Sequence, residues 1–326
     1  MFPRSLYFII WESRLILKLK DMTLEEVVLK LIEHPIYMKN GKGLLSKKFK
    51  CSQETIVEAR RIVRNSKSNT SSPRILIFDL ETAPMSAYVW GRWNQNISLS
   101  ATISEWFVLC WSAKWLYSDY MMSDKLTSEE VLNEDDSRIM KSLWTLVDEA
   151  DIIIAHNAKR ADVKWMNSRF IINGLNPPKP YYIIDTLEVA KKEFKFSSNK
   201  LDALAGYFGI EHKLDTNFDL WKKCLKGDVE ALNYMCEYNK VDVDILEKVY
   251  IKMRPWIKNH PNLGNILESR DNRCSLCSSK DIKIIPDKYY YTSVGKYPIY
   301  RCSKCGGISR GRKSLNNNTR LTSIAR

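Results

Sequence analysis

The sequence predicts an α/β domain with a mixed central sheet flanked by helices, a helical segment before it and a small cysteine-containing ribbon after it. Apolar runs rich in β-branched residues alternate with helical patterns through the middle of the chain, which is typical of α/β domains. A polar run, NSKSNTSS, precedes this region, and two Cys-x-x-Cys pairs follow it. We therefore expect a helical segment at 22–64, a linker at 65–72, the α/β domain at 73–258, the ribbon at 271–313 and a disordered tail at 314–326.

Residues 1–21 do not fit the pattern that follows them. Their apolar stretch is short, is interrupted by Glu12 and Arg14, and lacks the cleavage site of a signal peptide. A regular helical pattern begins at Met22. We expect residues 1–21 either to be disordered or to precede a translation start at Met22.

The segment at 22–64 predicts short helices joined by tight connections. An apolar-periodic helix at 24–33 is followed by a second helical part, in which Ser52 is a suitable N-cap. The last helix carries Arg60, Arg61 and Arg64, so the segment resembles a helix-turn-helix, and these arginines become candidate substrate-binding residues. The alternative is a helical cap on the domain that follows.

The α/β domain itself is predicted from eight segments. They are strands at 74–80, 108–111, 151–155 and 182–184, and helices at 136–149, 162–173, 200–208 and 228–253.

The net charge of +13 is concentrated at the two ends of the chain. Residues 1–72 carry 14 Lys and Arg against 7 Asp and Glu, residues 271–326 carry 12 against 3, and residues 73–270 carry 25 against 28. Basic flanks favour a polyanionic partner, although they could serve solubility alone, and an acidic middle suits a cation site. No segment has the ~20 apolar residues that span a bilayer, so we expect no membrane partner and a cytoplasmic location.

Asp79 and Glu81 close the first predicted strand. Alternate residues of a strand share a face, so the two carboxylates project from the same side. A divalent cation with oxygen ligands would relieve their repulsion. Such a pair alone is a weak signal, because most are solvated strand ends.

Two further segments place polar side chains at the ends of predicted elements. The strand at 151–155 leads to His156 and Asn157, and Asp162 falls in the first turn of the next helix. Tyr238 and Asp242 are four residues apart, so they lie on one face of the helix at 228–253. Singly, each has a structural explanation such as capping or solvation, but together the three segments form a pattern.

In this order and spacing, the three segments resemble the exonuclease motifs of the DEDD superfamily of 3′–5′ exonucleases, also called DnaQ-like. The tyrosine four residues before the last aspartate resembles the tyrosine branch of that superfamily. The resemblance spans about residues 74–253 and implies the ribonuclease H-like fold. The chain also resembles predicted phage and bacterial ribonuclease H-like exonucleases with a C-terminal zinc ribbon.

The resemblance implies a two-metal hydrolysis of terminal phosphodiesters that releases nucleoside 5′-monophosphates. It assigns His156 and Asn157 to substrate binding, and gives Glu81 an additional contact with the 3′ hydroxyl. The phenol of Tyr238, a poor base near neutral pH, is expected to orient the attacking water. Two Mg²⁺ or Mn²⁺ ions, about 3.5–4 Å apart, are expected on four carboxylates: Asp79, Glu81, Asp162 and Asp242.

Tryptophans crowd the segment after the first motif. Trp90 and Trp93 fall in a predicted loop, where they could stack on the bases of a frayed strand and bind the substrate. The alternative is core packing, which we expect for Trp106, Trp111 and Trp115.

The eight cysteines fall into two groups. Cys51, Cys110, Cys224 and Cys236 are scattered and are expected to be reduced thiols. The other four form two Cys-x-x-Cys pairs separated by 24 residues, the spacing of one structural Cys₄ zinc ion in a zinc ribbon. The basic, tyrosine-rich sequence between the pairs favours nucleic-acid contact over a purely structural module, and a redox role is a further alternative. The expected zinc ligands are Cys274, Cys277, Cys302 and Cys305.

The sequence therefore predicts a 3′–5′ exonuclease that acts on single-stranded or frayed 3′ ends in proofreading or end processing. DNA is favoured and RNA stays open, and proofreading would require a separate polymerase chain. One alternative is a ribonuclease H-like endonuclease on hybrid or branched nucleic acid, against which Tyr238 argues. The other is a non-catalytic nucleic-acid-binding accessory protein, against which the complete set of carboxylates argues.

Overall fold

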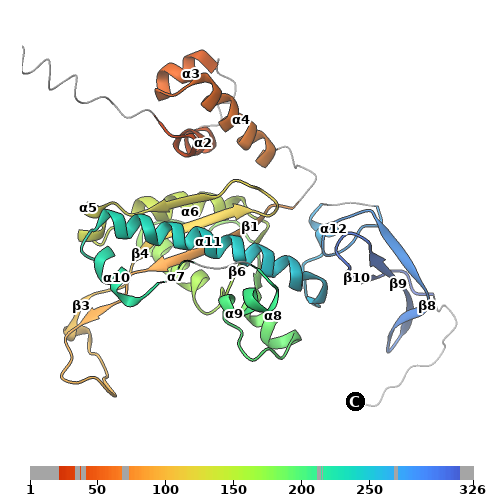
Figure 1. Cartoon of the computed structure of the whole chain (residues 1–326). Coiled ribbons are helices and arrows are strands. Elements are labelled where there is room, and N and C mark those ends of the chain that lie inside the picture. The colour runs from red at the N-terminus through yellow and green to blue at the C-terminus, as the bar shows by residue number, and fades with distance from the viewer. Residues whose placement is uncertain are drawn as a thin grey trace, which may run out of the picture. The chain divides into compact units, whose positions relative to one another are not determined.

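The computed structural model describes residues 22–33, 37, 42–67, 73–210, 214, 216–267 and 271–315, without the side chains of 32–33 and 61–67. The chain divides into two compact units, Met1–Ser71 and Ser72–Arg326. Figure 1 labels their elements. The predictions for residues 1–21, and for the tail beyond residue 315, concern residues outside those described.

The described residues of the first unit include three helices whose ends follow from their sequence. Thr23 and Glu26 exchange hydrogen bonds of 3.3 and 2.7 Å between side chain and backbone, which is a capping box. Ser52 accepts a 3.0 Å bond from the backbone of Thr55 and so caps the last helix. That helix runs three residues into the predicted linker, whose remainder, 68–72, is not described. The helices are α2 (Leu24–Glu33), α3 (Lys42–Phe49) and α4 (Gln53–Lys67).

The second unit is built on a mixed five-stranded sheet, which confirms the predicted architecture. The strand order is β5-β4-β1-β6-β7. β1 is antiparallel to β4 and parallel to β6, β7 is parallel to β6, and β5 is antiparallel to β4. The strands are β1 (Ile75–Thr82), β4 (Val108–Trp115), β5 (Met122–Lys125), β6 (Ile152–Ala155) and β7 (Tyr182–Asp185).

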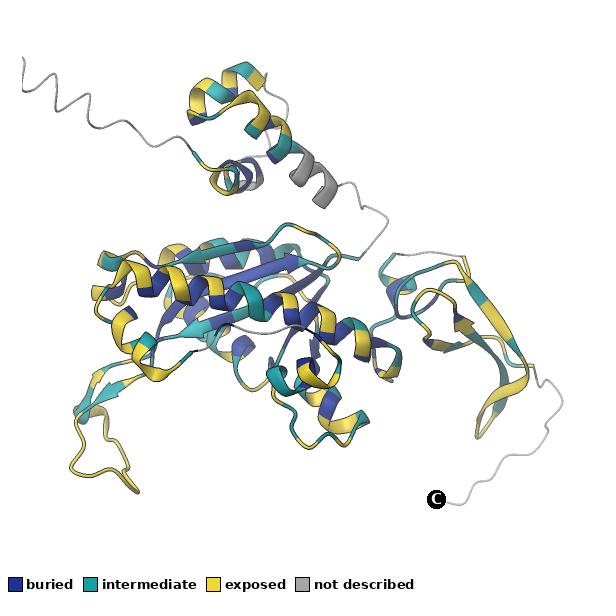
Figure 2. Ribbon diagram, in the orientation of Figure 1, coloured by how far each residue is buried: buried dark blue, intermediate teal, exposed yellow. Residues whose placement is uncertain are grey.

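Helices cover the sheet, and Figure 2 shows that the buried residues concentrate on the strands and on the helix sides that face them. Trp111 of β4 is buried and donates a 2.8 Å hydrogen bond to the carbonyl of Ile139, as the core-packing interpretation predicts. The helices are α5 (Ser128–Leu132), α6 (Ser137–Glu149), α7 (Asp162–Ile172), α8 (Thr186–Glu193), α9 (Leu201–Tyr207), α10 (Phe218–Cys224), α11 (Val229–Met253), η3 (Arg254–Trp256) and α12 (Leu263–Ile266).

Central strand β1 divides its side chains between two cores. Leu76 and Phe78 belong to a core that includes the buried faces of α6 and α7. Ile75 and Ile77 belong to a second core with residues of α11. Because alternate residues share a face, Asp79 continues the Ile77 side, and α11 lies across this part of the sheet in Figure 1.

A partly buried ion cluster fixes α11 to the sheet. Lys114 of β4 is 8% exposed, and its Nζ lies 2.8 Å from Asp244 and 2.7 Å from Glu247. Glu247 also accepts a 2.8 Å hydrogen bond from the backbone of Tyr117. The rotation of α11 about its axis is therefore set by charged contacts as well as by apolar packing.

Asp136 is the centre of a second buried network. It is 0% exposed and accepts bonds of 2.6 and 2.8 Å from Arg169, 2.8 Å from Asn173 and 3.0 Å from the backbone of Val108. Asp136→Ala should lower the free energy of unfolding by about 3–5 kcal/mol, because it leaves a guanidinium buried without its carboxylate. Urea denaturation, followed by circular dichroism, measures the free energy of unfolding of the variant and the wild type.

The exposed pair of Asp219 and Lys222 provides the control. Its atoms lie 2.8 Å apart, but the two side chains are 70% and 60% exposed. Asp219→Ala should therefore change stability by less than about 1 kcal/mol. Equal effects of the two substitutions would show that burial does not strengthen the Asp136 network.

Two smaller sheets project from the second unit. A hairpin of β2 (Ser86–Ala87) and β3 (Thr102–Ser104) follows β1 and carries the short helix η2 (Leu99–Ala101). The C-terminal sheet has the order β10-β9-β8, from β8 (Ile282–Thr292), β9 (Gly295–Cys302) and β10 (Ile308–Arg310). None of the described helices has the length and apolar character that crossing a membrane requires.

Candidate functional site

Three carboxylates meet where β1 ends under α11. One oxygen from each of Asp79, Glu81 and Asp242 lies within 4.8 Å of the other two. β1 supplies the first two residues and α11 the third. Mg²⁺ and Mn²⁺ prefer such oxygen ligands, so the donor set fits a divalent cation.

Asp162 lies beside this cluster in the first turn of α7 and is 4% exposed. Burial raises the pKa of Asp79 well above its usual value, and the negative charges of Asp162, Glu81 and Asp242 raise it further. Burial also raises the pKa of Asp162, to about 7. A cation among these groups would favour their ionised forms and so lower their pKa values.

Tyr238 points its phenol into the same site. Burial raises the pKa of Tyr238, as do the charge of Asp242 and the hydrogen bond between the two side chains. A hydrogen bond with Thr216 lowers the pKa of Tyr238 and so partly offsets these effects. Tyr238 is therefore a neutral phenol at physiological pH, able to donate or accept a hydrogen bond but unsuited to act as a base.

His156 follows β6 and is engaged within the protein. Its Nε2 lies 3.0 Å from the carbonyl of Asn199, and its Nδ1 lies 2.9 Å from the hydroxyl of Thr186. Burial lowers the pKa of His156, so the ring is neutral, with Nε2 donating to the carbonyl and Nδ1 accepting from the hydroxyl. These contacts link the loop after β6 to the start of α8.

Asn157 occupies the left-handed backbone region, with φ of 68°. Its backbone N–H donates to Asp185 at 3.0 Å, and that of Lys159 donates to the same carboxylate at 3.1 Å. Asp185 also caps α8 by accepting from Leu187 at 3.0 Å. The loop that leads to Asp162 is therefore held by one buried carboxylate at the end of β7.

The hairpin after β1 carries the two candidate stacking residues. Trp90 is fully exposed and Trp93 is 83% exposed. The backbone of Ala83 donates a 2.8 Å hydrogen bond to Phe107, which closes the base of the hairpin two residues after Glu81. The indole rings are thus free to meet a ligand, on a segment that begins at the carboxylate site.

The three arginines of α4 belong to the first unit. Arg60 donates a 2.8 Å hydrogen bond to the carbonyl of Tyr37. The side chains of Arg61 and Arg64 lie outside those described. These arginines and the carboxylate site therefore belong to different units of the chain.

Sequence reasoning missed two residues next to the site. Asn239 is 0% exposed and donates a 2.7 Å hydrogen bond to Asp79. Trp221 of α10 donates a 3.1 Å bond to the carbonyl of Thr82. The signal available for Asn239 was its position three residues before Asp242, which places both side chains on one side of α11.

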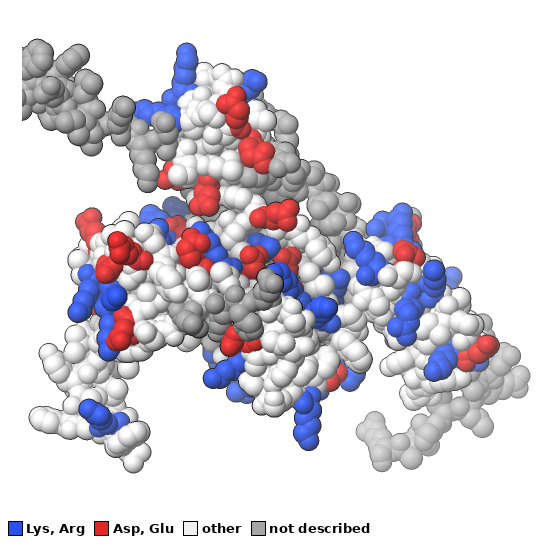
Figure 3. Space-filling view, in the orientation of Figure 1, with Lys and Arg blue, Asp and Glu red and all other residues white. Residues whose placement is uncertain are grey.

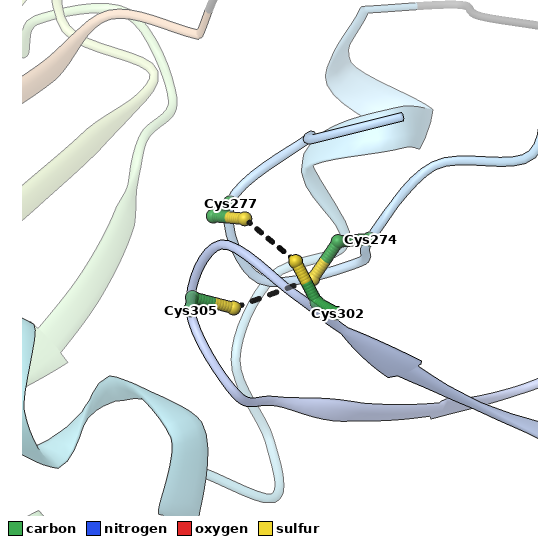
Figure 4. Close-up of side chains that lie close together, drawn as sticks. All are labelled: Cys274, Cys277, Cys302 and Cys305. Carbon is green, nitrogen blue, oxygen red and sulfur yellow. Dashed lines mark hydrogen bonds between the residues drawn. The ribbon is translucent and has the colours of Figure 1, made fainter. Parts of the chain in front are cut away.

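The four paired cysteines converge at the base of the C-terminal sheet (Figure 4). Two sulfur pairs, Cys274 with Cys305 and Cys277 with Cys302, are each 3.6 Å apart. Tetrahedral zinc with Zn–S bonds of ~2.3 Å requires S···S separations of ~3.8 Å. A hydrogen bond from Cys277 lowers the pKa of the Cys274 thiol to about 4, and the same contact raises the pKa of Cys277. The geometry of the four sulfurs fits a zinc tetrathiolate.

The C-terminal sheet presents cations against exposed tyrosines. Lys296 Nζ lies 3.7 Å from the ring centre of Tyr289, and the guanidinium of Arg310 lies 4.5 Å from that of Tyr297. Tyr291 is 65% exposed. In Figure 3, Lys and Arg outnumber Asp and Glu over this sheet. Such a surface suits the phosphates and bases of a nucleic acid.

A family model of the RNase_H superfamily matches residues 114–254. The match runs from the end of β4 through α11, so it contains Asp162 and Asp242 but not Asp79 and Glu81. Together with the mixed sheet, it supports a ribonuclease H-like fold for the central domain and a nuclease activity in general terms.

Among the solved structures, the family B DNA polymerase of the hyperthermophilic archaeon Pyrobaculum calidifontis is similar, with 14% identity and a TM-score of 0.40. The similarity covers 56% of this chain and 25% of the polymerase, so this chain corresponds to about a quarter of that protein. No curated protein matches the chain.

Proposed function

We propose that the chain is a metal-dependent 3′–5′ exonuclease of the tyrosine branch of the DEDD superfamily. The observation that carries the proposal is the grouping of Asp79, Glu81 and Asp242 within 4.8 Å, with Tyr238 hydrogen-bonded to Asp242. Four side chains from one strand and one helix thus combine a cation site with a neutral phenol. Asp162, which raises the pKa of Asp79 by its charge, is the fourth carboxylate that we assign to the two-metal site.

The residues divide the chemistry between them. Two Mg²⁺ or Mn²⁺ ions held by the four carboxylates would supply an acidified water and stabilise the charge on the leaving 3′ oxygen. Tyr238 orients the attacking water through its hydroxyl, which its raised pKa keeps protonated. Glu81 contacts the 3′ hydroxyl of the terminal nucleotide. The products are a nucleoside 5′-monophosphate and a strand shorter by one nucleotide.

The flanking regions are proposed to bind the nucleic acid. The helices at 22–64 act as a helix-turn-helix-like module through Arg60, Arg61 and Arg64, and the ribbon at 271–313 binds through its basic, tyrosine-rich sheet. His156 and Asn157 shape the loop next to the terminal nucleotide. We favour single-stranded or frayed 3′ ends of DNA, in proofreading beside a separate polymerase chain or in end processing in the cytoplasm.

The test uses 5′-labelled single-stranded DNA and RNA of one sequence, with Mg²⁺ or Mn²⁺. A ladder that shortens from the 3′ end, and that is absent with Asp79→Ala, is the expected result. The sugar that is degraded faster identifies the substrate. Internal cuts would establish the endonuclease alternative, and tight binding without variant-sensitive cleavage would establish an accessory binding protein.

Trp90 and Trp93 are proposed to stack on bases upstream of the terminal nucleotide. Each alanine substitution should weaken binding of a single strand about 5- to 150-fold, because one base–aromatic contact contributes ~1–3 kcal/mol. Fluorescence anisotropy in an Asp79→Ala background measures binding without cleavage. Trp256→Ala, which removes a 62% exposed indole from η3, is the control and should bind as the parent does. Unchanged binding by both hairpin variants would exclude stacking.

A further inference from the structure

One buried polar side chain beside the carboxylates has no role in the chemistry described above. Asn239 is 0% exposed and lies on the side of α11 that carries Asp242 three residues later. Its amide nitrogen donates a 2.7 Å hydrogen bond to Oδ2 of Asp79. The bond joins residues that are 160 positions apart, so it ties α11 directly to the end of β1.

The carbonyl oxygen of the same amide group argues against a purely structural role for Asn239. Oδ1 of Asn239 is buried and accepts no hydrogen bond from any described residue. A buried carbonyl oxygen without a donor lowers stability, whereas leucine would fill a similar volume without a polar group. Stability alone therefore does not explain an asparagine at this position.

The type of donor matters for a carboxylate that must bind a cation. A lysine or arginine in this place would neutralise Asp79 and compete with the metal for it. The amide of Asn239 carries no charge, so it fixes one oxygen and leaves the negative charge of the carboxylate in place. Partners that hydrogen-bond to a ligand hold that ligand in the orientation that the metal requires.

We propose that Asn239 is a positioning residue for the divalent metal, holding the Asp79 carboxylate in its binding orientation. The inference rests on the proposed function, because it assumes that Asp79 is a metal ligand. Loss of such a partner lowers metal affinity about 10- to 100-fold. Asn239→Leu should therefore weaken Mn²⁺ binding by this factor without lowering the stability of the metal-free protein, because loss of the bond to Asp79 is offset by removal of the unpaired buried Oδ1.

The experiment is a Mn²⁺ titration of the full-length chain, in which electron paramagnetic resonance reports the free ion. Four proteins are compared: the wild type, Asn239→Leu, Asn233→Leu and Asp79→Ala. Asn233 is exposed on the same helix, so its variant carries the same substitution away from the carboxylates. Urea denaturation of each protein in EDTA measures stability without the metal, a property that a structural role would change and a positioning role would not reduce.

The outcomes separate the inference from the function on which it rests. Weaker Mn²⁺ binding by Asn239→Leu alone, with stability at or above that of the wild type, supports the positioning role. Wild-type affinity in Asn239→Leu overturns the inference and leaves the nuclease proposal standing. Binding by the wild type that Asp79→Ala does not weaken overturns both. A loss of stability in EDTA equal to the loss of affinity would make Asn239 structural and would also overturn the inference.

Discussion

Asp242→Asn is expected to lower kcat about 10³-fold, while Asp244→Asn leaves kcat within about fivefold of the wild type. Both aspartates lie on α11, two residues apart. Asp242 belongs to the carboxylate cluster, whereas Asp244 faces Lys114 at 2.8 Å and is 51% exposed. Removing a charged metal ligand forfeits several kcal/mol of transition-state stabilisation, and ~4 kcal/mol corresponds to about 10³ in rate.

The measurement is steady-state cleavage of a 5′-labelled strand at saturating concentrations of the strand and of Mn²⁺. Each variant removes one negative charge from the same helix, so a general electrostatic effect on substrate binding would act on both. A comparable loss of kcat in the two variants would mean that the cluster is not the catalytic centre. Equal and near-normal rates would mean that the cleavage arises elsewhere.

Removing the metal from the four-cysteine cluster should unfold the C-terminal sheet. The described apolar cluster of this sheet consists of the four cysteines with Leu276 and Ile282. Most residues of β8 are exposed. The four cysteines are thus most of this core, and zinc bound to them, with an apparent binding free energy of ~10 kcal/mol or more, would supply the stability that burial does not. One zinc per chain is expected.

Hydrogen exchange before and after treatment with a strong chelator is the measurement. The amides of β8 and β9 should lose protection in the chelated protein, and those of β1 and β6 should keep it. Cys302→Ser should reproduce the effect, and Cys224→Ser, outside the cluster, should retain its zinc and its protected ribbon. A protected ribbon sheet in zinc-free protein would show that the metal does not support the fold.

Much of the fold follows from local sequence pattern. The strand predicted at 74–80 is observed as β1, and the helix predicted at 228–253 is observed as α11, capped by Asp228, which accepts a 3.0 Å bond from Ala231. The prediction at 108–111 ended at Trp111, four residues before the end of β4, and so left out Lys114. The charge of Lys114 is balanced by carboxylates about 130 positions away, which no local window can reveal. β5 was missed because a four-residue edge strand, MSDK, has no apolar run.

The candidate site, like the fold, could be predicted from the sequence only in part. Strand alternation predicted that Asp79 and Glu81 share a face, but the prediction that Asp162 and Asp242 join them rested on the resemblance to the exonuclease motifs. Asn239 was missed, although it lies three residues before Asp242, because an asparagine within a helix is locally an ordinary polar residue. Its role depends on the approach of β1, which the structure alone shows. The contacts of His156 with Thr186 and Asn199 were equally beyond reach, since they join segments 30 and 43 residues apart.

The contacts that anchor α11 restrict where this chain can gain or lose residues. Asp242 reaches the carboxylate site, while Asp244 and Glu247, on the same uninterrupted helix, hold Lys114. Inserting or deleting one residue after Val243 would rotate one group against the other by about 100°. Insertions and deletions should therefore be absent from this stretch, whereas the exposed loop that carries Trp90 and Trp93 can change length without disturbing the sheet.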